Sequence, residues 1–163
     1  MRPGVRVGVD VGSVRVGVAT SDPAGVLATP WATLARDGEQ GDLDALAGLV
    51  AERDALDVVV GLPLRLTGEE GHAAAAACQY AVALAQRVAP VPVRLVDERL
   101  STVDAHRALH ASGRSSRRHR AVVDQVAAVM ILQAALDLER DTGRPPGEAV
   151  LRRKPRHTKG WVR

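Results

Sequence analysis

Residues 5–20 alternate between valine and small or polar residues. Valine occupies every second position over residues 5–11 and most of them over 14–20, and Gly12 lies in the turn between the two runs. Alternation of this length is typical of half-buried strands, and a glycine turn between two such runs predicts a hairpin. A third extended run over residues 25–34 contains Pro30, which suits a sheet edge or a bulge. We therefore expect three consecutive strands that form an antiparallel meander.

The pattern changes its period after residue 40. Leu43, Leu46 and Leu49 form a helical stripe. A continuous apolar run at 56–63 is typical of a buried parallel strand, and residues 91–98 are expected to form another strand. Helices are expected over residues 42–54, 69–90, 101–113 and 119–143. The order β-β-β-α-β-α-β-α-α predicts an α/β fold with a mixed five-stranded sheet, in which the antiparallel three-strand meander and two parallel strands are flanked by helices.

Length and composition fit one globular domain. A chain of 163 residues that is 46% hydrophobic and 25% charged can bury a substantial core. We expect one domain over residues 1–142 and a flexible basic tail, rich in Pro and Gly, over residues 143–163. The chain has no apolar run of about 18 residues, no signal-peptide pattern and a single cysteine, Cys78. These features favour a cytoplasmic protein with no membrane partner.

Charge is unevenly distributed along the chain. Residues 1–98 carry 8 basic and 13 acidic side chains, whereas residues 99–163 carry 14 basic and 6 acidic ones. Clustered positive charge favours a polyanionic partner, although a solvated, Arg-rich surface has the same composition. Aromatic residues make up only 2% of the chain, so base stacking is not expected. Recognition of nucleic acid should therefore depend on backbone and shape, as in structured RNA or branched DNA.

Three acidic residues stand out by position. Asp10 lies in the first apolar strand, Glu98 directly follows another strand, and Asp124 begins the apolar part of the last helix. Strand carboxyl ends gather at one edge of an open α/β sheet, so these carboxylates are candidates for one site. Converging carboxylates favour a hard divalent cation, and a pair of such ions suits phosphodiester hydrolysis. Spacing leaves an alternative open, in which Asp10 caps a turn, Glu98 pairs with a nearby arginine and Asp124 caps a helix.

Four segments carry a resemblance to a known family. They are DVGSVRVGVATSD at 10–22, VVVGLPLRLTGEEG at 58–71, VRLVDERLSTVDAHRAL at 93–109 and VVDQVAAVMILQ at 122–133. In this order they resemble the motifs of the YqgF-type (RuvX-type) nucleases, which are also called Holliday junction resolvases or pre-16S rRNA nucleases. The resemblance covers about residues 5–138.

The resemblance implies a fold, a site and an activity. It implies an RNase H-like fold and a triad of Asp10, Glu98 and Asp124 that binds a divalent metal, Mg²⁺ or Mn²⁺. It also implies an endonuclease that matures the 5′ end of precursor 16S rRNA during ribosome biogenesis. Cleavage of four-way DNA junctions is the close alternative, because phosphate contacts alone do not choose RNA over DNA.

Residues near the triad are candidates for substrate binding. Gly12 leaves room for a phosphate or for a tight hairpin turn, and Arg15 contacts a phosphate or lies on an exposed strand face. Asp97 is expected to be structural, because adjacent strand residues point to opposite faces. Arginines just before Asp124 suit phosphate contacts at a helix N-terminus. The full candidate set is Gly12, Arg15, Arg99, Arg114, Arg117, Arg118 and Arg120.

Two other classes of function stay open, as does the oligomeric state. The D-x-G hairpin also occurs in sugar kinases and actin-like ATPases, but those proteins need two such lobes around a nucleotide. A non-catalytic nucleic-acid-binding adaptor would not need the triad. A junction resolvase acting on two strands would favour a homodimer, whereas an enzyme that trims rRNA could act as a monomer.

Overall fold

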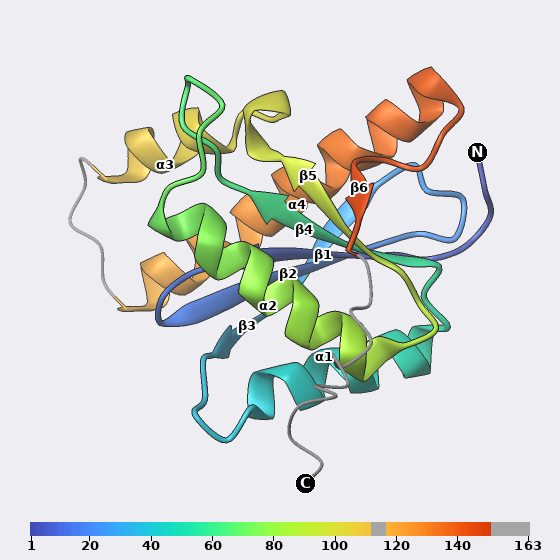
Figure 1. The fold of residues 1–163 in the computed structure, drawn as a ribbon, viewed down its shortest axis with the longest axis horizontal. Coiled ribbons are helices and arrows are strands. Elements are labelled where there is room, and N and C mark those ends of the chain that lie inside the picture. Colours follow the sequence, from blue (N-terminus) through green and yellow to red (C-terminus); the bar gives the residue numbers. More distant parts are fainter. Residues whose placement is uncertain (112–116, 151–163) are drawn as a thin grey trace, which may run out of the picture.

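A mixed six-stranded sheet forms the centre of the protein, whose computed structural model describes residues 1–111 and 117–150 (Figure 1). Along the sheet the strands follow the order β3-β2-β1-β4-β5-β6. β1 and β3 pair antiparallel with β2, while β4 pairs parallel with β1 and β5 pairs parallel with β4. The strands are β1 (Arg6–Val11), β2 (Arg15–Ser21), β3 (Ala28–Ala35), β4 (Asp57–Leu62), β5 (Val93–Asp97) and β6 (Glu148–Ala149).

The expected meander and the two parallel strands are confirmed, and one strand was missed. β6 pairs antiparallel with β5 and lies within the segment that the sequence analysis assigns to the tail. Two residues are too few to show an alternating pattern, so the sequence gives no signal for this strand. Residues 151–163 of the expected tail lie outside the described residues.

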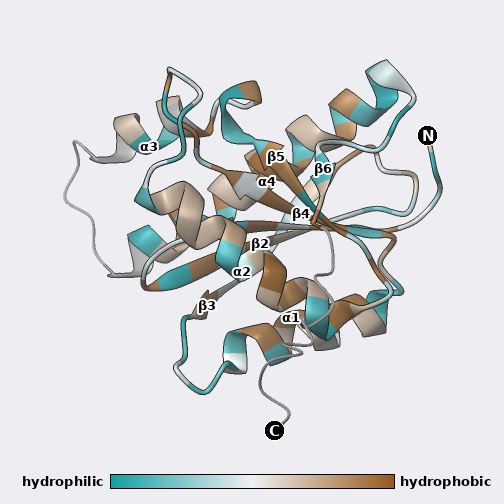
Figure 2. Ribbon diagram, in the orientation of Figure 1, coloured by the Kyte–Doolittle hydropathy of each residue, from teal (hydrophilic) through white to brown (hydrophobic). Residues whose placement is uncertain are grey.

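Helices cover both faces of the sheet. They are α1 (Gly41–Arg53), α2 (His72–Val88), the 3₁₀ turn η1 (Glu98–Leu100), α3 (Val103–Ala111) and α4 (Arg117–Thr142). α1 and α2 pack on one face against the valines of β1 and β2, whereas α4 packs on the other face (Figure 1). Figure 2 shows hydrophobic residues concentrated along the central strands between these layers. α3 lies at the rim of the sheet, beside the first half of α4.

Glycines bring α4 into close contact with the β1–β2 hairpin. A Cβ on Gly17 would lie 2.0 Å from the backbone carbonyl oxygen of Asp124, and one on Gly8 would lie 2.6 Å from Cβ of Leu132. Real Cβ atoms do not approach so closely, so any larger residue would push the helix away. Gly17 therefore fixes the height of α4 above the sheet at the position of Asp124.

A buried ion-pair network holds the other end of α4. Glu139 accepts from Arg2 at 2.6 Å and from Arg6 at 3.2 Å, and Arg2 also donates to Asp57 at 2.5 Å. Arg6, Asp57 and Glu139 are all buried, so each charge needs the partners that the network supplies. Since Arg6 and Asp57 begin β1 and β4, the network ties α4 to the amino ends of these strands.

One described segment has the length and composition that a membrane span needs, namely Arg120–Thr142 of α4. In this fold the helix packs against β1, β2 and β3, as a core helix does.

Replacement of Gly17 by alanine is expected to displace α4. The added methyl group would collide with the backbone of Asp124, and overpacking of this kind lowers the free energy of unfolding by roughly 3 kcal/mol. The matched control is Gly48→Ala in α1, where no described atom lies within 4 Å of the added Cβ. That change should stabilise the protein by about 0.5–1 kcal/mol, because alanine favours helix interiors over glycine. Urea denaturation measures both values, and a Gly17→Ala protein as stable as wild type would contradict the packing argument.

Candidate active site

A cleft of about 600 Å³ opens where β1, β4 and β5 end, and all three predicted carboxylates line it. One wall comes from the hairpin turn at residues 11–13 and another from the beginning of α2. Glu98 follows β5, Asp10 lies near the end of β1, and Asp124 reaches the same cleft from α4. The strand ends therefore gather Asp10 and Glu98, and α4 brings Asp124 to the same cleft, as the sequence predicts.

Asp10 occupies a buried position on the α4 face of the hairpin. It pairs in register with Gly17, and only 5% of it is exposed. Its pKa is raised well above the ordinary value, to about 7. Burial is the largest cause, Arg107 opposes the rise, and the charges of Glu98 and Asp124 add to it. Without a metal, Asp10 therefore holds a proton at neutral pH about as often as it is ionised.

Glu98 is positioned by the residues on both sides of it. The Asp97 side chain accepts from the backbone N–H of Arg99 at 2.9 Å and caps the 3₁₀ turn, which confirms the structural role expected for Asp97. Ser101 Oγ donates to the Glu98 carbonyl at 2.7 Å and closes the turn. The Glu98 side chain lies against Gly61 of β4, where a Cβ would sit 2.7 Å from Oε1. The sequence around Glu98 thus builds a rigid turn, and Gly61 leaves the space for its carboxylate.

Asp124 lies inside α4, seven residues after the helix begins, and does not cap it. Its carboxylate accepts from Arg15 Nε at 2.8 Å. Arg15 was a candidate phosphate contact, and in this structure it forms an ion pair across the mouth of the cleft instead of lying free on the strand. The contact joins β2 to α4 at the point where Gly17 allows their close approach.

Arg107 of α3 joins the two buried carboxylates. Its Nη2 donates to Asp10 Oδ1 at 2.5 Å, and its Nη1 donates to Glu98 Oε2 at 2.8 Å. From the sequence, a neighbouring arginine was the expected partner of Glu98 in the alternative without a metal. Arg107 was not among the candidate residues. Its position inside the third motif segment is the only signal that the sequence offers for this role.

The donor set fits a hard divalent cation. Asp10 and Glu98 contact the same guanidinium, so both carboxylates face one positively charged group in the cleft. Carboxylate oxygens are the ligands preferred by Mg²⁺ and Mn²⁺. In residues 1–111 and 117–150, no three His, Cys, Asp or Glu side chains are gathered closely enough to hold an ion together. Asp124 faces the same cleft but is held by Arg15, so a three-carboxylate site requires Asp124 to turn inward.

The remaining candidate substrate residues have different outcomes. Gly12 makes a tight turn, because its N–H donates to the Arg15 carbonyl at 2.9 Å and an added Cβ would lie 2.6 Å from that oxygen. Gly12 also lines the cleft, so a phosphate contact there stays a prediction. Arg99 pairs with Asp97 at 2.6 Å and donates to the Leu66 carbonyl at 3.4 Å, which directs it to the loop after β4.

The basic segment before Asp124 is only partly described. Arg120 is exposed at the start of α4. Arg114 and the side chains of Arg117 and Arg118 lie outside the described residues, so their phosphate contacts stay predictions.

Arg36 is a cleft residue that the sequence analysis missed. It follows β3, and its Nη1 donates to the Gly12 carbonyl at 3.3 Å. Its guanidinium carbon lies 5.4 Å from the centre of the Tyr80 ring, a cation–π distance. The Tyr80 hydroxyl in turn donates to buried Asp42 at 2.7 Å. This chain of contacts fixes a positive charge beside the hairpin turn.

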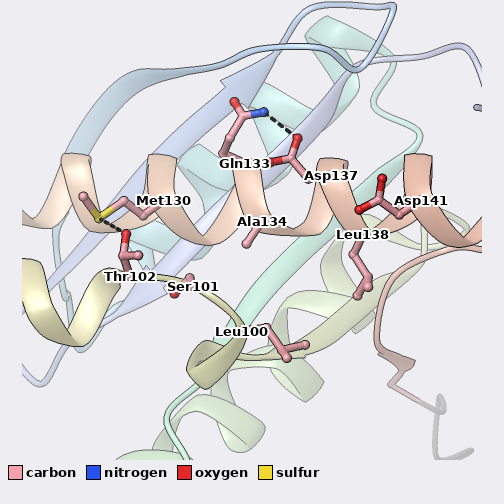
Figure 3. A pocket seen from close by; sticks show the side chains of 9 residues that line it. All are labelled: Leu100, Ser101, Thr102, Met130, Gln133, Ala134, Asp137, Leu138 and Asp141. Carbon is pink, nitrogen blue, oxygen red and sulfur yellow. Dashed lines mark hydrogen bonds between the residues drawn. The ribbon is translucent and has the colours of Figure 1, made fainter.

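A second cavity of about 440 Å³ lies between residues 100–102 and α4 (Figure 3). Its polar lining includes Asp137, which accepts from Gln133, and Asp141. Two carboxylates are unsuited to a phosphate backbone, and the residues that line this cavity include none of the predicted site residues. The chemistry of the predicted site therefore belongs to the first cleft.

Solved structures of the same architecture define the class of fold. The chain is similar to T. thermophilus RuvC in complex with a Holliday junction substrate, with a TM-score of 0.56 and 14% identity over 88% of this chain and 99% of that one. It is also similar to Thermus thermophilus RuvC by itself, with a TM-score of 0.54, 14% identity, and coverage of 90% and 99%. At this identity the likeness concerns the fold alone. The protein has an RNase H-like α/β fold, as predicted.

The sequence places the chain more narrowly. The family model described as "RuvX: Holliday junction resolvase" matches residues 4–138, so the chain belongs to the RuvX family. A relative from Kineococcus radiotolerans is 58% identical over 162 residues, which cover 96% of this chain and 86% of the relative. A relative from Thermobifida fusca is 54% identical over 157 residues, with coverage of 92% and 98%. Both relatives carry the name "Putative pre-16S rRNA nuclease".

Asp10→Asn is expected to remove a pH-dependent contribution to stability in the metal-free protein. Because the folded-state pKa is raised, protonated Asp10 stabilises the fold below about pH 4, and this contribution is lost as the pH rises to about 7. The difference in free energy of unfolding, variant minus wild type, should therefore increase by roughly 2–4 kcal/mol from pH 4 to pH 7 and level off above. Denaturant titrations in EDTA measure it. A difference that does not vary with pH would contradict the raised pKa.

Proposed function

We propose that this protein is a divalent-metal-dependent endonuclease that matures the 5′ end of precursor 16S rRNA. The observation that carries the proposal is the convergence of Asp10, Glu98 and Asp124 on one cleft at the strand carboxyl ends. The choice of substrate is supported by the names of relatives that are 54–58% identical over nearly the whole chain.

Asp10, Glu98 and Asp124 are the residues that would hold the metal. The metal would be a pair of divalent ions, Mg²⁺ or Mn²⁺. The chemistry that such ions supply when bound is activation of an attacking water and stabilisation of the leaving oxygen. The protein contributes a rigid cradle for two of the ligands, because Asp10 is held in the hairpin register and Glu98 in a capped turn.

Arginines on the cleft walls would bind the substrate backbone. Arg36 and Arg107 line the cleft, and Arg15 lies at its mouth through its ion pair with Asp124. Guanidinium groups recognise phosphate oxygens by paired hydrogen bonds without reading bases. The enzyme should therefore select its cleavage site by the shape of a structured RNA and by the position of its end.

Cleavage of a four-way DNA junction is the second candidate function. The description of the matching family model, Holliday junction resolvase, favours it. Such an enzyme would act as a homodimer that cuts two strands, whereas rRNA trimming needs one active site. The mass of the protein in solution, alone and with each substrate, separates these two modes.

Asp10→Asn should abolish cleavage while leaving the fold intact. Wild type with Mg²⁺ or Mn²⁺ should shorten a precursor 16S rRNA at its 5′ end, and the variant should be at least about 100-fold slower, because even residues that only support a metal ligand contribute about 10–100-fold. Gel assays on the precursor RNA and on a four-way DNA junction, with and without EDTA, measure the rates and the substrate preference.

The matched control is Asp141→Asn, an exposed carboxylate near the other end of α4. It should cleave as fast as wild type. Equal cleavage by the wild type and the Asp10→Asn protein would overturn the assigned site. Failure of the wild type to cut either substrate with either metal would overturn the nuclease proposal.

A further inference from the structure

We propose that Arg107 is the resident counter-cation of the metal-free site and competes with the divalent metal for Asp10 and Glu98. Metal affinity would then be set by how readily α3 withdraws this side chain. The inference rests on the proposed function, because it assumes that these carboxylates are the metal ligands. It assigns to Arg107 a regulatory contact within the active site.

The geometry of the contact is that of a bridging cation. One nitrogen of the guanidinium donates to Asp10 at 2.5 Å and the other to Glu98 at 2.8 Å. An arginine that merely anchored one carboxylate would direct both nitrogens to it, as a paired fork. Here the fork is split between Asp10 of β1 and Glu98 of the turn after β5, so its positive charge lies between the two carboxylates, where a shared metal would bind.

Burial makes this charge necessary while no metal is bound. Asp10 is 5% exposed and Glu98 is 3% exposed, and unpaired buried carboxylates strongly destabilise a fold. A single guanidinium meets the need of both. The metal and Arg107 therefore both neutralise the negative charge of the two buried carboxylates. When one of them is bound, the other is not needed for this purpose.

Arg107 is placed where it can leave. Its side chain is 35% exposed at the cleft, so solvent reaches the guanidinium without any opening of the core. α3 packs mainly on α4 and η1 at the rim of the sheet, and Ala105, Ala108 and Leu109 on it are exposed (Figure 1). The two carboxylates, by contrast, are fixed in the hairpin and in the capped turn. Exchange of cations should therefore move Arg107 and leave the ligands in place.

Arg107→Gln is expected to tighten metal binding. Glutamine keeps much of the length of the side chain but removes the competing charge. Since the variant removes two charge-assisted hydrogen bonds with which the metal must compete, Mn²⁺ affinity should rise by about tenfold or more. Calorimetry and the Mn²⁺ electron paramagnetic resonance signal of the EDTA-treated, dialysed full-length protein measure the affinity without nucleic acid.

The matched control is Arg99→Gln. Arg99 follows Glu98 directly, its side chain is also 35% exposed, and it pairs with Asp97 outside the cleft. Its removal lowers the local positive charge by the same amount, so it measures the general electrostatic effect. Arg99→Gln should change Mn²⁺ affinity by less than about threefold, since exposed charges are well screened.

A second measurement separates competition from a merely structural role. Metal-free Arg107→Gln should have a lower Tm than wild type, and saturating Mn²⁺ should raise its Tm by more than it raises that of wild type. If this variant does not fold without metal, Arg107→Lys serves instead, because its single ammonium group is a poorer bridge and should still bind Mn²⁺ more tightly than wild type. The inference would be overturned if Arg107→Gln bound Mn²⁺ no more tightly than Arg99→Gln does. Where Arg107→Lys is used in its place, the same comparison applies to Arg107→Lys.

The result is distinguishable from failure of the proposed function. If Asp10→Asn binds Mn²⁺ as tightly as wild type, the carboxylates are not the ligands, and the proposed site and the inference fall together. If Asp10→Asn loses Mn²⁺ while the Arg107 variants bind it like wild type, only the competition fails.

Discussion

The close contact between α4 and the β1–β2 hairpin is the constraint on which the rest of the structure depends. Gly8 and Gly17 remove the side chains that would hold the helix away from the sheet, and the backbone of Asp124 lies directly over Gly17. At the amino ends of the strands, the network around Glu139 fixes the other end of the same helix. The helix is therefore held at two points, and its carboxylate is delivered to the cleft at a defined height.

Buried carboxylates are paired with different arginines at the two ends of the sheet. At the amino ends, the buried side chain of Arg6 pairs with Glu139, and the partly exposed Arg2 pairs with both Glu139 and Asp57. At the carboxyl ends, Asp10 and Glu98 are equally buried, but their partner Arg107 reaches them from an exposed helix. A permanent ion pair suits the first place, where only stability is needed. Under the proposed function, an exchangeable ion pair suits the second place, where the metal and the substrate phosphate would enter.

Much of the fold could be predicted because it rests on local patterns. The alternating valines gave the meander, and the apolar runs gave the two parallel strands. The carboxylates could be placed at one edge because strand ends meet there. β6 could not be predicted, because two residues have no periodicity. Arg107 could not be predicted either, since its pairing depends on where α3 is placed in space. The role of Gly8 and Gly17 was also not predicted, because it depends on the placement of α4 above the hairpin.

The register of the β1–β2 hairpin determines what happens when the two strands pair in the wrong alignment. Asp10 lies opposite Gly17 on the face toward α4, while Val9 and Val18 face α1 and α2. A slip of one residue in β1 would turn every side chain to the opposite face and push Asp10 into the densest apolar layer of the molecule. The misaligned chain would thus bury a charge without a partner, whereas the aligned one offers it a cation. Asp10, the residue proposed as a metal ligand, therefore also disfavours the wrong strand register, because only the native register gives its carboxylate a partner.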